Sequence, residues 1–469
     1  MSPPLRNGDE DGDRMTFLRV VCIVLGASLL PAQTIQAPWR RVFPRESAEG
    51  SVRLWRATPP LWTRGRQPMW PVTPTTFPGA VSTTGNAYVT PSQMRNAYGV
   101  SLLYYISTIA IVDAYDSPSV EADLQVFSAT YGLPGCTSDN GCFTKVNQNG
   151  LKIYPRRDVL WESEINLDVQ WAHAMAPNAK ILLVEAHSDS DADLFAAVNY
   201  AQQKATIVSM SWSGPEWEGQ QFYEATVFNR SHVTFLAASG DQPGVVRYPA
   251  SSANVIGVGG TSFATNSLGF VILPVTESGW SDQYGGTGGG CSVYTPQPSY
   301  QATWAPSTCK MRGVPDISLD ADPASGVMVY ISRQGGWVVY GGTSLACPML
   351  AGLLANVNGY RAVTAGKSAS APLGDALLSI YTAATRNYTL YFNDVKTGGR
   401  PFAAGPRWDF STGLGSPKAG ALMQYLVTST DPPNSFPGDA GSPAVRRFSP
   451  VKRALGVDPS PPDSGPPPQ

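Results

Sequence analysis

The chain of 469 residues is long enough for two or three ordinary domains or for one large α/β domain. Its formal net charge is -2 and only 14% of its residues are charged. This balance argues against nucleic acid as a partner and against a wholly disordered chain. The abundant glycines and prolines, 46 and 41, indicate many turns and at least one segment without regular structure.

Residues 1–37 have the pattern of a secretory signal. The apolar run Val20–Leu30 follows Arg19 and precedes small residues, and it is too short to span a bilayer. Met15 is an alternative start, because residues 1–14 are acidic and polar; a buried N-terminal helix is the structural alternative. We therefore expect a secreted, extracellular protein with no stable membrane insertion.

Composition divides the rest of the chain into three parts. Residues 38–87 are predicted to be a linker, since they are rich in Pro, Arg and Trp without clear periodicity. Globular composition begins at Tyr88, and we expect one large domain over 88–428. The Pro-rich segment 429–469 cannot bury a core and is predicted to be disordered.

Apolar strands alternate with helical segments through the first half of this domain. Helices are expected over Val120–Tyr131, Ala192–Gln203 and Gln220–Asn229. Strands are expected over Thr108–Asp113, Lys180–Glu185, Ile207–Ser211, Thr234–Ala238 and Val255–Val258. Such alternation predicts an α/β fold with a largely parallel sheet and helices on both faces. Ligands of these sheets bind at the carboxyl ends of the strands, where Asp113 and Ser211 lie.

A segment with helical periodicity, Trp161–Ala174, carries two carboxylates on one face. Glu164 and Asp168 are four residues apart, which is about 40° around a helix. Two close carboxyl groups share a proton, which raises one pKa and allows the pair to act as a general base in acid. A solvated helix face is the alternative, although the surrounding side chains are large and apolar.

The stretch Gly341–Pro348 reads Gly-Gly-Thr-Ser-Leu-Ala-Cys-Pro between the strand-like Trp337–Tyr340 and the apolar helical run Met349–Asn358. Ser344 therefore lies at the mouth of a helix, where N–H donors can hold an oxyanion while the hydroxyl attacks a carbonyl. A helix cap is the alternative role. Asp241 follows another strand and, when protonated, could donate to an oxyanion; an ordinary turn residue is its alternative.

Histidines and cysteines complete the candidate chemistry. His173, His187 and His232 do not occur in a nucleophile-and-base context, so we expect structural or surface roles for them. Two local disulfides and one free thiol are the simplest pairing of the cysteines that follow the signal. The expected pairs are Cys136–Cys142 and Cys291–Cys309, with Cys347 free.

These motifs together resemble the sedolisin family, the serine-carboxyl peptidases with a subtilisin-like fold. The matching segments are Glu-x-x-x-Asp at Glu164–Asp168, Ala-Ser-Gly-Asp at Ala238–Asp241 and Gly-Thr-Ser-x-x-x-Pro at Gly342–Pro348. The resemblance implies Ser344 as nucleophile, Glu164 as its general base, Asp168 as the partner of Glu164, and Asp241 as oxyanion-hole donor.

The resemblance also implies one structural Ca²⁺ site near the C-terminus. Its ligands would be the carboxylates of Asp394 and Asp409 and the backbone carbonyls of Val395, Gly405 and Arg407. Oxygen-only ligation suits calcium. Arg407 stands where the family usually has Gly, and a simple Gly/Asp turn is the alternative.

The sequence departs from the family in two further ways. A large N-terminal pro-domain does not fit between the expected signal and Tyr88, and Asp241–Gly244 is one residue longer than the usual turn. The sequence predicts a secreted, monomeric endopeptidase that cleaves polypeptides in acid through an acyl-enzyme. Ser211 and Gly214 would receive the substrate backbone by strand addition. The alternatives are a subtilisin-like Ser/His/Asp peptidase using Asp113, and an inactive secreted binding protein with a peptidase fold.

Overall fold

The computed structural model describes residues 88–100, 107–230, 232–266, 271–272, 275–364 and 373–429. The expected signal and linker, and all but the first residue of the expected tail, lie outside these ranges. None of the helices in the described ranges is long and apolar enough to cross a membrane.

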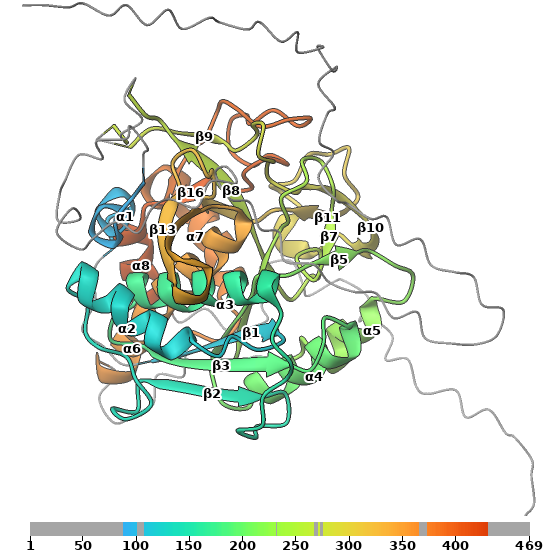
Figure 1. Ribbon diagram of the computed structural model, residues 1–469. Helices are drawn as coiled ribbons and strands as arrows, with labels where there is room; N and C mark the ends of the chain where they lie inside the picture. The colour runs from blue at the N-terminus through green and yellow to red at the C-terminus, as the bar shows by residue number, and fades with distance from the viewer. Residues whose placement is uncertain are drawn as a thin grey trace, which may run out of the picture. The chain divides into compact units, whose positions relative to one another are not determined.

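A parallel sheet forms the centre of the described chain. Its strand order is β12-β8-β6-β4-β1-β3-β2, and β9 pairs with β8. The strands are β12 (Ile317–Asp320), β8 (Ile256–Phe263), β6 (Thr234–Ala238), β4 (Ile207–Met210), β1 (Thr108–Ala114), β3 (Lys180–Ala186), β2 (Phe143–Asn147) and β9 (Glu277–Gly279). Every neighbouring pair is parallel except β8–β9, and the arrows of β1, β2 and β3 point the same way in Figure 1. The predicted α/β fold is therefore confirmed.

Two hydrophobic cores lie on opposite faces of this sheet. The larger core includes α1 (Pro91–Tyr98), α2 (Val120–Tyr131), α3 (Val159–Met175), α6 (Thr343–Thr364), α7 (Ala376–Tyr391) and α8 (Ala419–Thr428). The smaller core includes α4 (Asp191–Ala201) and the residues that follow α5 (Gln221–Thr226).

Alternation along β1 assigns its side chains to these faces. Ile109 and Ile111 belong to the core that contains α3 and α6, whereas Ala110 and Val112 belong to the core that contains α4. Because successive side chains of a strand point to opposite faces, Asp113 points to the α3 side.

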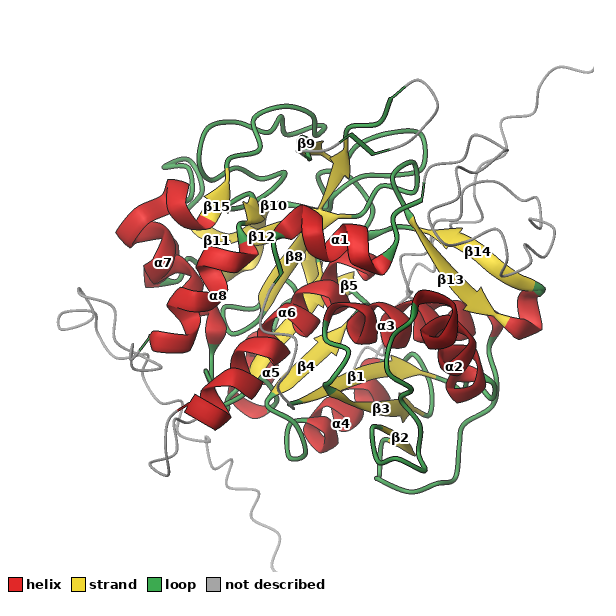
Figure 2. Cartoon of the chain, turned by 90° about the vertical axis from the view of Figure 1, so that its left-hand side faces the viewer, coloured by secondary structure: helices red, strands yellow, loops and turns green. Residues whose placement is uncertain are grey.

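Short two-stranded sheets surround the main sheet. They are β13 (Val327–Ile331) with β14 (Gly336–Tyr340), β10 (Gly290–Pro296) with β11 (Met311–Val314), β5 (Gly214–Pro215) with β7 (Arg247–Tyr248), and β15 (Phe392–Asn393) with β16 (Ser416–Pro417). Figure 2 shows the β13–β14 hairpin beside α2 and α3, away from the main sheet. Short 3-10 turns cover Ser299–Gln301 and Ser332–Gln334.

The helix after Ser344 differs from the prediction in where it starts. It begins at Thr343, before the predicted helical run Met349–Asn358, so Ser344 is its second residue and Pro348 lies inside the helix. A proline has no N–H for the carbonyl four residues earlier, which here belongs to Ser344. The Ser211 hydroxyl donates to that carbonyl instead, at 3.4 Å. A neighbouring strand end thus provides the hydrogen bond that the helix lacks.

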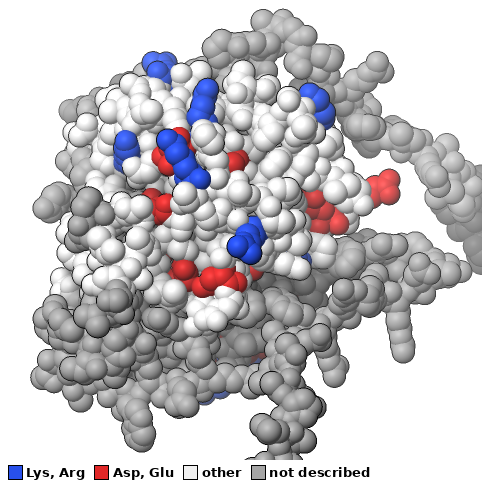
Figure 3. All heavy atoms as spheres, turned by 90° about the horizontal axis from the view of Figure 1, so that it is seen from above, with Lys and Arg blue, Asp and Glu red and all other residues white. Residues whose placement is uncertain are grey.

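The expected cysteine pairing is confirmed. Cys136 is bonded to Cys142 and Cys291 to Cys309, while Cys347 is free and buried. Charged side chains are sparse on the face seen in Figure 3, where a few Lys, Arg, Asp and Glu side chains lie among mostly uncharged atoms.

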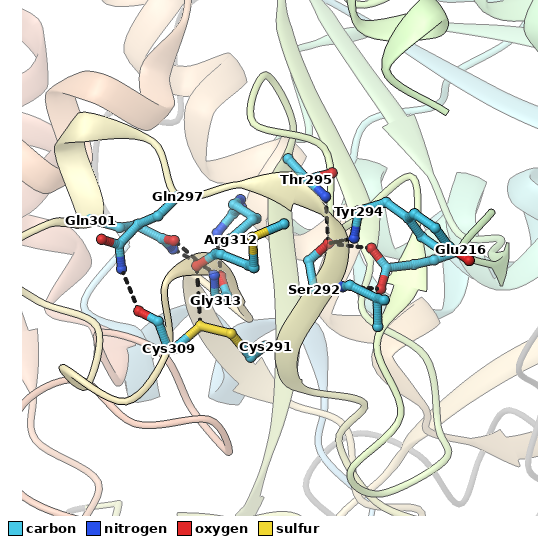
Figure 4. The surroundings of a disulfide bond; sticks show 12 residues. Glu216, Cys291, Ser292, Tyr294, Thr295, Gln297, Gln301, Cys309, Arg312 and Gly313 are labelled. Carbon is cyan, nitrogen blue, oxygen red and sulfur yellow. Dashed lines mark hydrogen bonds between the residues drawn. A yellow bond between two sulfur atoms is a disulfide. The ribbon is translucent and has the colours of Figure 1, made fainter. Parts of the chain in front are cut away.

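Arg312, which lies beside the Cys291–Cys309 disulfide in Figure 4, forms a buried ion pair with Asp316. The guanidinium of Arg312 contacts both carboxylate oxygens of Asp316 at 2.9 and 2.5 Å, and both side chains are fully buried. Arg312 also donates to the carbonyls of Ser252 and Val255 at 3.2 Å each. The pair therefore ties β11 to the segment that leads into β8.

We expect Arg312→Met to lower the free energy of unfolding by about 3–5 kcal/mol, since it leaves Asp316 buried without its counter-charge. Urea unfolding measures the effect, with Lys310→Met as the control because Lys310 is exposed two residues away. Equal stability of the two variants would contradict this role of the ion pair.

Candidate active site

Ser344 is positioned by a turn that only glycines can form. Gly342 has φ 93°, and a Cβ at Gly341 would lie 2.5 Å from the carbonyl oxygen of Ala321. This close approach brings the end of β14 directly into α6. The Ser344 hydroxyl is buried and has no hydrogen-bond partner among the described residues, so it is available for chemistry.

Glu164 lies in the second turn of α3, a helix that Asp158 caps by accepting from the N–H groups of Leu160 and Trp161. Burial raises the pKa of Glu164 well above its ordinary value, and the charges of Asp113 and Asp241 raise it further. The Ser344 hydroxyl is close enough to lower that pKa, although the two groups do not reach hydrogen-bond geometry. Such contacts tighten when substrate binds.

Three carboxyl groups share this buried region. Burial raises the pKa of Asp168, and the charges of Asp113 and Glu164 raise it further, while the Ser211 hydroxyl lowers it. Burial also raises the pKa of Asp113 to about 8. No oxygen of these three carboxyl groups has a hydrogen-bond partner among the described residues. The three groups are not all charged at the same time, because each charge opposes the others. The cluster therefore keeps protons at pH values well above those at which ordinary carboxyl groups ionise.

Asp113 is the member of this cluster that sequence reasoning did not include in the site. The sequence marks it as a strand-end residue, and as the counterpart of a subtilisin Asp, but not as a neighbour of the α3 carboxylates. The available signal was the alternation on β1, which directs Asp113 to the same face as Ile109 and Ile111.

Asp241 is held by the residue before the nucleophile. Its Oδ1 accepts from the N–H and from the hydroxyl of Thr343, each at 2.8 Å, while Oδ2 is buried without a partner. Burial raises the pKa of Asp241 to about 7, and the two bonds from Thr343 lower it. When protonated on Oδ2, this side chain is a hydrogen-bond donor beside the start of α6.

The three histidines take other positions. His173 is fully buried on α3, contacts the carbonyl of Pro134 at 2.9 Å and has its pKa lowered to about 4 by burial. His187 and His232 are exposed. His173 is bonded to Pro134, and His187 and His232 are exposed whereas Ser344 is fully buried, so none of the three forms a Ser/His/Asp arrangement with Ser344.

The segment predicted to receive substrate borders the nucleophile. Ser211 is buried and bonded to the Ser344 carbonyl. Gly214 lies in β5, pairs with Tyr248, and has no atom within 4 Å of where a Cβ would be. Open space therefore lies beside Gly214 in β5.

The predicted calcium ligands lie in one loop region, and Asp394 has donors of its own. Its Oδ1 accepts from the N–H of Arg407 at 2.7 Å and from the Tyr388 hydroxyl at 3.0 Å. Its Oδ2 is 3.2 Å from the Lys396 ammonium, whose side chain is 60% exposed. This exposed lysine can move away, which would leave Oδ2 open to a cation.

Asp409, the second predicted carboxylate, is buried and accepts from backbone N–H groups. Gly405 donates to Oδ2 at 3.0 Å, and Ser411 and Thr412 donate to Oδ1 at 2.8 Å each. The predicted ligands of this loop are all oxygen atoms, which is the ligand type that Ca²⁺ prefers. Binding requires that the Lys396 ammonium moves away from Asp394.

Comparisons with known proteins agree with this arrangement. The sequence profile described as "Subtilase family" matches residues 162–368. Kumamolisin of Bacillus sp. (strain MN-32) is 35% identical over 298 residues, covering 57% of this chain and 51% of kumamolisin. Sedolisin of Pseudomonas sp. (strain 101) is 30% identical over 359 residues, covering 68% of this chain and 58% of sedolisin. The chain thus spans between half and three fifths of the length of these relatives.

A solved structure of Pseudomonas sedolisin, a serine-carboxyl proteinase complexed with two molecules of pseudo-iodotyrostatin, is similar in fold. It superposes with a TM-score of 0.59 at 28% identity, over 73% of this chain and 98% of the solved chain. The match supports a subtilisin-like fold with a mainly parallel sheet.

We expect Asp113→Asn to change how stability depends on pH. A carboxyl group whose pKa is raised by folding contributes fully to the free energy of unfolding below its unfolded pKa of ~3.9. This contribution is lost as pH rises toward the folded pKa. For Asp113 that folded value is about 8. Wild type should therefore lose stability between pH 4 and pH 8, and the variant should lose less, by at least about 1 kcal/mol.

Urea unfolding at pH 4, 6 and 8 measures this difference. Asp139→Asn is the control, since Asp139 is exposed. Parallel stability curves for wild type and Asp113→Asn would show that Asp113 does not hold a proton in the folded state.

Proposed function

Because this chain belongs to the sedolisin family of serine-carboxyl peptidases, we propose that it is a serine-type endopeptidase that cleaves polypeptides. The observation that carries the proposal is the assembly of Ser344 with Glu164 and Asp168 in one buried region, with Asp241 held beside the start of the same helix. These residues come from α3, α6 and the end of β6.

Glu164 is the proposed general base. It takes the Ser344 proton as the hydroxyl oxygen attacks the scissile carbonyl, and an acyl-enzyme forms and is then hydrolysed by water. Asp168 and Asp113 position and tune this base, because their charges oppose a second ionisation next to it. Because burial and the neighbouring carboxylates raise its pKa, Glu164 becomes available as a base only as pH rises, which sets the acidic limb of activity.

Asp241 is the proposed oxyanion donor. The tetrahedral intermediate carries a negative oxygen, which an ionised Asp241 would repel and a protonated Asp241 would stabilise. The bonds from Thr343 occupy Oδ1 and leave Oδ2 for the proton. Activity therefore depends on Asp241 remaining protonated.

Secretion and an acidic working environment belong to this proposal. Two disulfides are expected in an oxidising compartment. A monomer is consistent with a site formed wholly by residues of one chain.

We also propose one structural calcium ion between Asp394 and Asp409. It would bind the two carboxylates and the backbone carbonyls of Val395, Gly405 and Arg407, and it would neutralise two acidic groups of one loop. It has no part in the reaction.

Ser344→Ala and Glu164→Gln should each lower kcat by about 10⁴ or more, since nucleophile and base act as a unit. Hydrolysis of a denatured protein at acidic and neutral pH measures the loss, and circular dichroism confirms folding. A folded wild-type protein that binds peptides without cleaving them would favour the inactive binding protein over the peptidase.

The pH profile of kcat/KM should be bell-shaped, with an alkaline limb set by Asp241. Its raised pKa of about 7 means that the active protonated form is lost as pH rises through that value. Asp241→Ala should lose roughly 10²–10³ in kcat, the usual cost of one oxyanion donor. Asp241→Asn keeps a donor that cannot ionise, so its alkaline limb should move to higher pH. An alkaline optimum in wild type would reject the carboxyl mechanism.

Calcium should raise the melting temperature and a chelator should lower it. Binding to the native state alone adds about 2.7 kcal/mol when the free ion is at 100 times its Kd. Lys396→Gln should enlarge the calcium effect, because it removes the competing ammonium from Asp394. Identical melting of wild type and Lys396→Gln with calcium and with chelator would dismiss the site.

A further inference from the structure

Asn387 lies at a kink in α7 and begins one of the two Asn-x-Ser/Thr sequences of the chain, Asn-Tyr-Thr at Asn387–Thr389. The other is Asn-Arg-Ser at Asn229–Ser231. Neither has proline in the middle, and this pattern is the acceptor of N-glycosylation in proteins that enter a secretory pathway. Because so short a pattern also arises by chance, the surroundings of each asparagine decide whether it is a suitable acceptor.

The backbone of Asn387 departs from the helix. Its φ and ψ are -160° and 86°, an extended conformation inside α7. Asn387 and Thr389 are exposed, whereas Tyr388 between them is half-buried. The asparagine and the hydroxyl-bearing residue that the pattern requires are therefore both on the surface.

Tyr388 fixes this segment to the body of the domain. The centroid of its ring lies 5.6 Å from that of Trp304 and 5.8 Å from that of Phe392. Its hydroxyl donates to Asp394 Oδ1 at 3.0 Å. Because the middle residue of the pattern is held by these contacts, a sugar on the exposed Asn387 displaces no packed side chain.

The two polar atoms of the Asn387 side chain have different surroundings. The oxygen Oδ1 accepts from the Thr389 hydroxyl at 3.3 Å and from the N–H of Leu390 at 3.2 Å. The nitrogen Nδ2 has no acceptor among the residues that the structure describes. Nδ2 is the atom to which a sugar is attached, so glycosylation leaves both bonds of Oδ1 in place.

The second pattern offers a less available nitrogen. Asn229 is exposed after α5, but its Nδ2 donates to the carbonyl of Ala225 at 3.2 Å. Its hydroxyl-bearing residue, Ser231, lies outside the described residues. Asn387 is therefore the acceptor that the geometry favours.

We propose that Asn387 is N-glycosylated. This inference rests on the proposed secretion of the chain and not on its peptidase activity. The donor is an oligosaccharide carried on a lipid pyrophosphate. Asn387 Nδ2 forms a bond to the anomeric carbon of the sugar, and the bond from that carbon to the pyrophosphate oxygen breaks. The lipid pyrophosphate leaves, and one amide proton passes to a base of the transferase. The product is a bulky, hydrophilic group over the kink of α7.

The test is expression of the full chain in a eukaryotic cell line, followed by peptide mapping of the secreted and the intracellular protein. The wild-type peptide that contains Asn387 should carry the mass of an N-linked oligosaccharide. Peptide N-glycosidase in heavy-oxygen water should remove this mass and leave a labelled aspartate at that position. An inhibitor of lipid-linked oligosaccharide synthesis should abolish the modification without any change of sequence.

Variants separate the modification from a structural role of the side chain. Thr389→Ala keeps Asn387 but removes the required hydroxyl, so the glycan should be lost. Thr389→Ser keeps a hydroxyl and should retain the glycan. Asn229→Gln is the matched control, because it removes the other pattern and should leave the glycan on Asn387 unchanged. Circular dichroism checks that each variant folds.

The possible failures are distinguishable. A secreted wild-type chain without sugar on Asn387, or a glycan retained in Thr389→Ala, overturns this inference and leaves the peptidase proposal intact. A chain that stays in the cytosol unmodified overturns the proposed secretion and this inference together. Ser344→Ala should be glycosylated like wild type, so the activity of that variant tests the peptidase proposal independently.

Discussion

Burial of carboxyl groups without cations governs this molecule's candidate site. Asp113, Glu164 and Asp168 are fully buried, and among the described residues none of their oxygens has a hydrogen-bond partner. Transfer of a single unpaired carboxylate into such a region is expensive, so the folded state retains protons that water would remove. In the proposed reaction, the same raised pKa favours transfer of the Ser344 proton to Glu164. The pH dependence of stability and the proposed proton transfer thus have the same cause, the burial of these carboxyl groups.

The sheet explains why these groups meet. Parallel strands end at a common edge, and β1, β4 and β6 bring Asp113, Ser211 and Asp241 to it. Helix α3 packs against α6, which adds Glu164 and Asp168 to the residues around Ser344. The buried Arg312–Asp316 ion pair lies elsewhere in the fold and has a structural role, because it joins β11 to the segment that leads into β8.

Much of this arrangement could be predicted from local sequence. The helical spacing of Glu164 and Asp168, the Gly-Gly-Thr-Ser turn and the strand-helix alternation each carry short-range signals that the structure confirms. Other features depend on contacts between distant segments. Asp113 lies beside Glu164 and Asp168 because its strand packs against α3, and the Ser344 carbonyl is bonded to Ser211, which is more than a hundred residues earlier. The bonds of Asp394 and Asp409 likewise depend on loop closure, which spacing does not reveal.

The proline in α6 has a consequence beyond helix geometry. Because Pro348 has no N–H to offer, the peptide unit of Ser344 is anchored to Ser211, at the end of a strand, and not to its own helix. The nucleophile is therefore mechanically linked to the segment that borders the open gap beside Gly214. Any displacement of that segment is transmitted through one hydrogen bond to the attacking residue.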